Sequence, residues 1–288
     1  MLCHSNIHSP SYQLIFIAMK IVFLGGGNMA NALIGGMLQQ GFAASDITVI
    51  DPGAEARLKL EQTYGVRTLA SAMNADSAGD LLMLAVKPQQ MKDAVAPLVA
   101  KLGEALVVSI AAGLDIGALS RFLGGHRKIV RCMPNTPALI GQGITGLCAA
   151  PEVDATGRDA ADRVLKAVGT TVWIADEGKM DGVTALSGSG PAYVFLFIEA
   201  MQQAAAELGF TPEQGRQLAI ETVQGAAALA AASPEPASTL RERVTSKGGT
   251  TEAALNKMAE MGVKAGIVAG VKAAEARGQE LGKLLGAA

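Results

Sequence analysis

The sequence predicts an α/β protein in two parts, an amino-terminal domain built on a parallel sheet and an all-helical carboxy-terminal domain. Between residue 20 and about residue 176, short runs of Val, Ile and Leu alternate with amphipathic stretches. Near-continuous apolar strands that alternate with helices are typical of a parallel sheet covered on both faces. Beyond Asp181 the strand signals stop, and alanine-rich helical patterns continue to the end. We expect the boundary near 177–181, which gives domains 19–178 and 179–288.

The expected strands of the first domain are short and rich in β-branched residues. They are KIVFLG (20–25), DITVID (46–51), DLLMLAV (80–86), ALVVSIA (105–111), KIVRCMP (128–134), GITGLCA (143–149) and TVWIAD (171–176). Helices are expected between them, near 29–40, 53–63, 88–101, 115–123 and 154–168.

In the second domain, a helix is expected to begin after Thr211. Thr211 is suited to cap it, Pro212 to occupy its first position and Gln214 to complete a capping box. The preceding helix, PAYVFLFIEAMQQAAAEL (191–208), is apolar around most of its first two turns. A helix that is apolar all round has to be buried. A domain of this size offers little to cover it, so a partner chain is expected on residues 192–200.

Composition limits the function classes. Half of the 288 residues are hydrophobic, 17% are charged and the net charge is −2, so a large core is expected and a nucleic-acid surface is not. The three cysteines fit neither a disulfide framework nor a zinc spacing. These features favour a cytoplasmic protein without a metal.

The first eighteen residues differ from the rest. They contain no Lys or Arg and no small-residue cleavage site, so they do not resemble a secretory signal. The apolar run 14–24 is shorter than the roughly 20 residues that span a bilayer. We expect residues 1–18 to be a dispensable extension and expect no association with a membrane.

A dinucleotide-binding signal follows the first strand. In FLGGGNMANAL, Gly25 and Gly27 occupy the first two glycine positions of the fingerprint, and Ala30 occupies the third. The glycines allow a tight turn and a close approach of pyrophosphate to the helix N-terminus, while a small third residue keeps helix and strand together. The next strand ends in Asp51, near the expected spacing. We expect a Rossmann-type NAD(P) site.

The sequence leaves the choice between NADPH and NADH open. Asp51 is suited to accept a hydrogen bond from a ribose 2′-hydroxyl and would repel a 2′-phosphate, unless Arg57 or Arg67 compensated. The alternative is that Asp51-Pro52-Gly53 only forms a turn.

The chain lacks an obvious general base. Outside the first eighteen residues, His126 is the single histidine, and its position beside two glycines favours an ordinary surface residue. Lys87 follows a strand at the expected cofactor edge, although local capping by Lys87-Pro88 explains it equally well. A protonated imine accepts hydride without an enzymic base, so positioning alone can accelerate its reduction.

The stretch SKGGTT (246–251) precedes a helix expected to begin near Glu252. Free amides of Gly249, Thr250 and Thr251 at a helix N-terminus would bind a small carboxylate. An ordinary capped helix start is the alternative.

Six segments in order together resemble the pyrroline-5-carboxylate reductase family, and the similarity runs from Met19 essentially to the end. They are GGGNMANAL (25–33), LAVKPQ (84–89), VSIAAG (108–113), RCMPNTPALIGQG (131–143), ALSGSGPAYVF (185–195) and TSKGGTTEAAL (245–255).

The resemblance implies NADPH-dependent or NADH-dependent reduction of a cyclic imine carboxylate, 1-pyrroline-5-carboxylate, to L-proline, the last step of proline biosynthesis. It also implies a helical domain like that of 6-phosphogluconate dehydrogenase, dimers formed through the carboxy-terminal helices, and often five such dimers in a ring. The implied cofactor contacts are Leu24, Gly25, Gly26, Gly27, Asn28, Met29, Asp51, Ala85, Val86, Lys87, Pro88, Ile110, Ala111, Ala112 and Asn135.

By the same resemblance, Ser246, Gly249, Thr250 and Thr251 bind the substrate, and Thr251 is placed close to its nitrogen for orientation or proton relay. Ser187 and Ser189 would touch ligand or simply allow close packing. Lys247 stands where the family commonly has proline, and Asp51 puts the preference for NADPH in doubt. A β-hydroxyacid-type dehydrogenase and a non-catalytic NAD(P)-binding regulator are the alternative functions.

Overall fold

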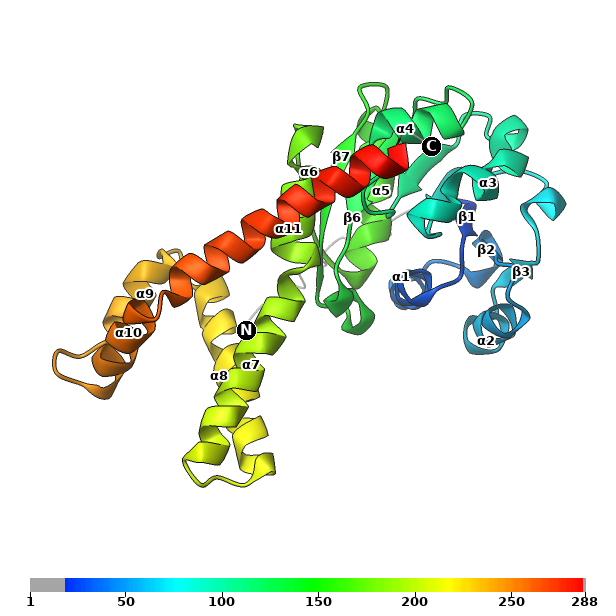
Figure 1. The fold of residues 1–288 in the computed structure, drawn as a ribbon. Coiled ribbons are helices and arrows are strands. Elements are labelled where there is room, and N and C mark those ends of the chain that lie inside the picture. Colours follow the sequence, from blue (N-terminus) through cyan, green and yellow to red (C-terminus); the bar gives the residue numbers. More distant parts are fainter. Residues whose placement is uncertain (1–18, 287–288) are drawn as a thin grey trace, which may run out of the picture.

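The computed structural model describes residues 19–286 (Figure 1). The expected extension 1–18 lies outside the described residues. The eight-stranded sheet has the order β3-β2-β1-β4-β5-β6-β7-β8. Its strands are β1 (Ile21–Leu24), β2 (Ile47–Ile50), β3 (Arg67–Leu69), β4 (Leu81–Leu84), β5 (Leu106–Ser109), β6 (Ile129–Met133), β7 (Gly143–Ala149) and β8 (Gly169–Trp173).

Helices of the first domain connect these strands. They are α1 (Asn28–Gln39), α2 (Ala54–Tyr64), α3 (Met91–Val95), α4 (Ile116–Phe122) and α5 (Ala155–Leu165). Successive residues of β1 point to opposite faces of the sheet, as the two-residue period of a strand requires. Ile21 and Phe23 pack in the core on one face, and Val22 and Leu24 pack in the core on the other. The prediction of a sheet buried on both faces is confirmed.

The sheet is not parallel throughout, because β7 runs antiparallel to β6. Residues 134–142 connect the two strands, and this connection is too short for the crossover that parallel neighbours need. β8 returns to a parallel pairing with β7, after α5.

Two elements of the first domain differ from expectation. The short strand β3 was not predicted, because Arg67-Thr68-Leu69 has no apolar run. The single helix expected over 88–101 is divided into a 3-10 turn at Pro88–Gln90, the short α3 and a 3-10 segment at Ala96–Lys101. Pro97 has no N–H to donate, so a regular helix cannot continue through it.

The second domain is helical, as predicted. It contains α6 (Met180–Val183), a π-helical turn at Thr184–Gly188, α7 (Gly190–Glu207), α8 (Pro212–Ala232), α9 (Ala237–Arg243), α10 (Thr250–Glu260) and α11 (Val263–Gly286). The capping box of Thr211 and Gln214 is present at the start of α8. Helix α10 begins two residues earlier than expected, at Thr250.

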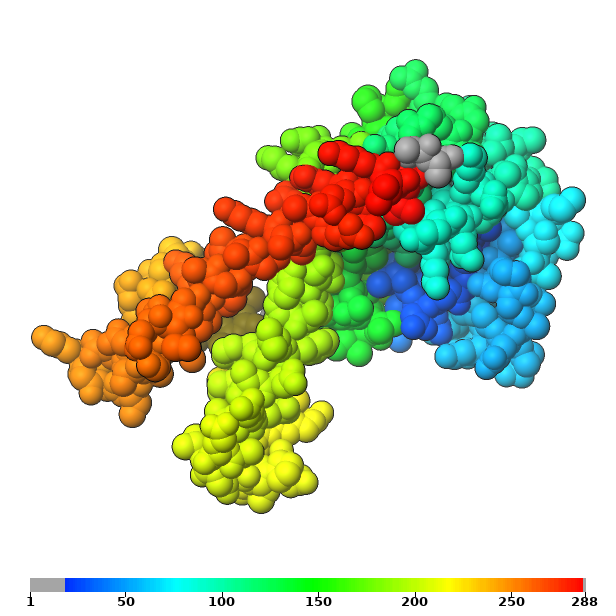
Figure 2. Space-filling view, viewed as in Figure 1, coloured from blue at the N-terminus to red at the C-terminus, as the bar shows by residue number. Residues whose placement is uncertain are grey.

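The helical domain extends away from the sheet as two arms (Figure 2). One arm is the pair α7 and α8, and the other comprises α9, α10 and the first half of α11 (Figure 1). Helix α11 then returns to the first domain, where Arg121 of α4 donates a hydrogen bond to the Gly286 carbonyl over 2.8 Å. Most residues of both arms are exposed in the single chain.

Within residues 19–286, one helical stretch is long and apolar enough to cross a membrane by length and composition, namely Glu177–Glu207. Only 6% of the residues in its most apolar 18-residue window are buried in the single chain. Val194, Phe195, Leu196 and Phe197 lie there and are between 43% and 66% exposed. The helix expected to need an outside cover is thus uncovered within one chain.

Candidate active site

The glycine-rich loop between β1 and α1 has the geometry that the fingerprint predicts. Gly25 has a φ of +103°, and a Cβ atom there would lie 2.6 Å from the carbonyl oxygen of Ala85. Its amide donates to the Ile50 carbonyl over 2.8 Å. Only glycine allows both this backbone conformation and this approach. The loop is therefore held tightly against the ends of β2 and β4.

Gly27 has a different role at the N-cap of α1. A Cβ atom there would meet no atom within 4 Å, so the space beside it is open. The N-cap has no side-chain hydrogen bond, and the amides of Asn28 and Met29 begin the helix without intrahelical acceptors. This combination of open space and unpaired amides suits a pyrophosphate group.

A cleft of about 700 Å³ lies against this loop at the carboxyl ends of β1, β2 and β4. Its volume is within the range typical of cofactor sites. The lining includes the expected residues Leu24, Gly25, Gly27, Asp51, Ala85, Val86 and Lys87. It also includes Ile50, Pro52, Ala70, Ser71, Ala72, Gln89, Gln90, Asp93, Ala94 and Pro97, which were not expected.

Ser71 and its neighbours were missed because they follow the unpredicted strand β3. In a parallel sheet, the residues after each strand meet at the same edge. Recognising Arg67–Leu69 as a strand would therefore have placed residues 70–72 in the cleft. Gln89 and Gln90 follow Lys87 and Pro88 in the connection after β4, and this position was a usable signal.

Asp51 forms the turn that was the alternative expectation, and it also lines the cleft. Its Oδ1 accepts a hydrogen bond from the Gly53 amide over 2.7 Å, which closes the turn. Its Oδ2 accepts from the Gly26 amide over 2.8 Å while the residue lines the cleft. Arg57 donates to the carbonyls of Asp51 and Pro52, and Arg67 pairs with Asp76 over 3.7 Å. Neither arginine therefore contacts the Asp51 carboxylate.

Lys87 and the segment after β5 border the same edge of the sheet. Lys87 is exposed in the cleft, and its main-chain carbonyl accepts from the Gln90 amide over 2.9 Å. Pro88 does begin a 3-10 turn, but the Lys87 side chain does not cap it. The Ile110 amide donates to the Leu84 carbonyl over 3.1 Å, which places residues 110–112 next to the end of β4.

Asn135 connects the two domains. Its Nδ2 donates to the Ser187 carbonyl over 3.2 Å, and its Oδ1 accepts from the Ile144 amide over 3.0 Å. The Ser187 hydroxyl donates to the Val183 carbonyl over 2.9 Å. Sequence reasoning assigned Asn135 to the cofactor and missed this connecting role, for which a single buried asparagine gives no signal.

The stretch 246–251 forms the expected glycine-rich start of α10, with one difference. The Gly249 amide donates to the Ser246 carbonyl over 3.0 Å, so the expectation that it is free is wrong, because the chain turns back on itself before the helix. Thr250 and Thr251 occupy the first two helical positions, and no side chain caps the helix. The Glu252 carboxylate accepts instead from the Gly248 amide over 2.7 Å.

The cofactor cleft and this helix start are far apart within one chain. Figure 1 shows α10 at the end of one arm, well away from the domain that contains β1, β2 and β4, whose carboxyl ends border the cleft. A small substrate cannot bridge them. One protomer therefore does not bring Thr251 to its own cleft.

His126 has a structural role. Its Nε2 lies 2.9 Å from the Ala105 carbonyl oxygen. Ala105 immediately precedes β5, so the ring lies at the amino ends of the strands, opposite the cleft. An ordinary surface residue was expected here, and the ring is instead only partly exposed.

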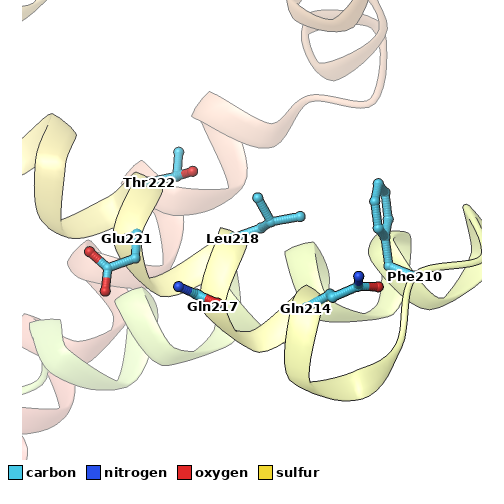
Figure 3. Close-up of a pocket in the computed structure, with 6 residues that line it drawn as sticks. All are labelled: Phe210, Gln214, Gln217, Leu218, Glu221 and Thr222. Carbon is cyan, nitrogen blue, oxygen red and sulfur yellow. The ribbon is translucent and has the colours of Figure 1, made fainter.

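A second hollow lies on the outer face of α8 (Figure 3). Its volume is about 590 Å³, and its lining residues are Phe210, Gln214, Gln217, Leu218, Glu221 and Thr222. Apart from Phe210 they all project from one helix face. Leu218 and Phe210 are 52% and 45% exposed. The hollow is distant from the glycine-rich loop and belongs to the exposed surface of the arm.

Comparison with known proteins identifies the family. The chain is 44% identical over 270 residues to a pyrroline-5-carboxylate reductase of Pseudomonas aeruginosa, covering 93% of this chain and 98% of that protein. This chain belongs to the pyrroline-5-carboxylate reductase family. Residues 177–281 match the family model for pyrroline-5-carboxylate reductase dimerisation. Residues 20–113 match a model described as NADP oxidoreductase, coenzyme F420-dependent.

Solved structures of this family share the fold. A pyrroline-5-carboxylate reductase from Coxiella burnetii has a TM-score of 0.86 and 37% identity, covering 92% of this chain and 98% of its own. A Plasmodium falciparum pyrroline carboxylate reductase with NADP bound has a TM-score of 0.82 and 29% identity, with the same two coverages. The dimerisation match covers α7 and α8, so the uncovered apolar face and the hollow of Figure 3 belong to an oligomerisation domain.

Proposed function

We propose that this protein is an NAD(P)H-dependent oxidoreductase that reduces 1-pyrroline-5-carboxylate to L-proline. The observation that carries the proposal is the 44% identity, over nearly the whole of both chains, to a protein named for this activity. The cleft agrees with the reaction. It offers glycine-loop amides and small side chains, with Asp51, Lys87 and Asp93 as its titratable groups. A cationic C=N group needs positioning more than a strong base.

The cofactor, when bound, supplies the hydride. The α1 amides and the open space at Gly27 are proposed to hold its pyrophosphate, and Asp51 its adenosine ribose. Residues 85–88 and 110–112 lie further along the same sheet edge and are proposed to hold the nicotinamide half. Asn135 is proposed to keep this edge in register with the helical domain through its bond to Ser187.

The substrate carboxylate is proposed to bind at the start of α10. Thr250 and Thr251 present the first two helical amides and two hydroxyls, with Ser246 and Gly249 beside them. A helix N-terminus attracts an anion through these amides. The proposed role of Thr251 is to orient the ring nitrogen through its hydroxyl.

The active site is proposed to form between two subunits. Within one chain, α10 lies at the end of an arm that points away from the domain lining the cleft (Figure 1). The arm that carries α10 belongs to the region matched to the dimerisation model. A homodimer in which the α10 of each subunit meets the cleft of the other would bring the two parts together. A ring of five such dimers is the larger assembly that the family resemblance suggests.

For the cofactor we propose that NADPH is used and that NADH is also accepted. The Plasmodium falciparum structure holds NADP, which supports NADPH. Asp51 opposes a 2′-phosphate by charge, while Arg57 donates to the main-chain carbonyls of Asp51 and Pro52 and Arg67 pairs with Asp76. NADH is therefore expected to be a better substrate here than in a relative with a neutral residue at this position.

Mixed dimers test the intersubunit site. Gly27→Asp is expected to fold, since a side chain there meets open space, and to lose cofactor binding by repelling pyrophosphate. The double variant Thr250→Ala and Thr251→Ala leaves the cleft intact. Each variant alone should have little activity towards 1-pyrroline-5-carboxylate.

Mixed dimers are obtained by co-expressing the two variants with different affinity tags. In such a dimer, one of the two sites combines an intact cleft from one subunit with an intact α10 from the other, and this site should be active. No recovery would mean that each chain builds its own site.

A further inference from the structure

We propose that Lys101 is a positioning residue for the adenosine half of the cofactor site. This inference rests on the proposed dinucleotide function of the cleft. The Lys101 Nζ donates to the carbonyl oxygens of Met73 and Ala75 over 2.9 and 2.7 Å, with a third, longer contact of 3.5 Å to Ala72. Lys101 is 26 to 29 residues away in the sequence from the residues it contacts, so these are tertiary contacts.

The contacted carbonyls end a short turn that begins in the cleft wall. Ser71 caps the 3-10 turn Ala72–Asn74 by accepting from the Met73 amide over 3.2 Å. Ala70, Ser71 and Ala72 line the cleft. Residues 70–72, at the start of this turn, form part of the cleft wall, and Lys101 holds the end of the turn through the carbonyls of Met73 and Ala75. Charge-assisted hydrogen bonds of this kind are stronger than neutral ones.

The position of this wall along the cofactor follows from the strand order. β3 neighbours β2, and the Asp51 amide donates to the Leu69 carbonyl over 3.0 Å. Residues 70–72 therefore lie beside Asp51, where a Rossmann domain binds the adenosine ribose. Residues 85–88 and 110–112, proposed for the nicotinamide half, follow other strands. Loss of the Lys101 contacts should consequently weaken binding without disturbing hydride delivery.

Packing alone does not fix the turn. Ala72, Ala75 and Ala78 are buried, with exposures of 6%, 6% and 0%, but their side chains are single methyl groups. Met73 between them is 74% exposed. The main chain adds one anchor, since the Ala78 amide donates to the Lys101 carbonyl over 3.2 Å. At the exposed end of the turn, the Lys101 ammonium therefore supplies the hydrogen bonds that the carbonyls of Met73 and Ala75 accept.

The test compares three variants with the wild-type enzyme, namely Lys101→Met, Lys101→Arg and, as a control, Lys59→Met on the exposed face of α2. Binding of NADH, NADPH and ADP-ribose is measured by titration calorimetry, and kcat and the KM for 1-pyrroline-5-carboxylate are measured at saturating cofactor. Lys101→Met should raise all three Kd values by the same factor, about fivefold or more, because charge-assisted bonds are lost. The Arg variant should restore most of the affinity, and the control should change nothing.

The ADP-ribose measurement separates positioning from general structure. A merely structural role would leave the Kd of ADP-ribose unchanged, or would lower kcat together with affinity, and either result overturns the proposal. If Lys101→Met does not fold, Lys101→Gln, which keeps a neutral donor, carries the same comparison. A wild-type enzyme that binds no dinucleotide would instead refute the proposed function of the cleft.

Discussion

The Oδ2 atom of Asp51 accepts a hydrogen bond from the main-chain amide of Gly26 over 2.8 Å. The residue that we propose to face the adenosine ribose thus also holds the glycine-rich loop. Its second oxygen closes the turn at Gly53. A shorter side chain at position 51 therefore removes both the charge and the support of the loop, and an experiment has to separate the two.

Replacing Asp51 by Ser should shift the cofactor preference towards NADPH. The repulsion between the carboxylate and a 2′-phosphate disappears, and we expect the ratio of kcat/KM for NADPH over NADH to rise about tenfold, equivalent to about 1.4 kcal/mol. Steady-state kinetics with each cofactor measure this. Asp51→Asn is the matched control, since its amide oxygen still accepts from Gly26 without a charge. An unchanged ratio in both variants would remove Asp51 from cofactor selection.

Thr251→Ala should lower kcat/KM for 1-pyrroline-5-carboxylate about tenfold or more, while the Kd of the cofactor stays nearly constant. A lost hydrogen bond to a charged substrate group accounts for a change of this size. Stopped-flow or steady-state kinetics, together with fluorescence titration of NADPH, give the two quantities. Thr63→Ala on the exposed face of α2 is the control. Equal losses of activity and cofactor affinity would show that the start of α10 is not the substrate pocket.

The glycine-rich loop and its place beside Asp51 were predictable because their signals are local. Gly25, Gly27 and Asp51 are fixed by a strand, a turn and the next strand, all within about 30 residues. The positive φ at Gly25 and the open space at Gly27 follow from the same fingerprint. Lys87 was found in the same way, from its place directly after a strand.

The remaining features depend on tertiary contacts that no local pattern encodes. β3 exists because β2 offers a free edge, and its own residues give little strand signal. Its omission hid Ser71 and the Lys101 contacts. Pro97 divided a predicted helix, and a short connection reversed β7. The separation of Thr251 from the cleft depends on the direction of the arms, which periodicity does not give.

Arg131→Met should destabilise the junction between the two domains. Arg131 is only 6% exposed, and its guanidinium lies 3.4 Å from Glu177 and 3.2 Å from Asp181. Glu177 also accepts from the Ile116 amide over 2.7 Å. Removing a buried partner leaves two carboxylates without their counter-charge, and we expect a loss of about 2 kcal/mol in the free energy of unfolding.

Urea unfolding followed by circular dichroism measures this loss. Arg127→Met is the matched control, since Arg127 pairs with Glu152 but its side chain is 72% exposed. A surface pair of this kind contributes about 0–1 kcal/mol. Equal effects of the two substitutions would mean that the Arg131 contacts do not stabilise the junction.

Phe195→Glu on α7 should separate the subunits and abolish activity together. Phe195 is 63% exposed in the single chain and lies on the apolar face that the dimerisation match covers. A buried, unpaired carboxylate in an apolar interface costs several kcal/mol, so the dimer should dissociate at micromolar concentration. Size-exclusion chromatography with light scattering gives the mass. The control is Leu58→Glu, at a residue that is 53% exposed on α2 of the first domain.

The two readouts together discriminate between models of the site. If the α10 of one subunit completes the cleft of the other, the monomeric variant should still bind NADPH, because its glycine-rich loop is intact, yet should not reduce the imine. A monomer with full activity would show that one chain suffices. A dimer of normal mass would show that the apolar face of α7 is not the interface that holds the two subunits together.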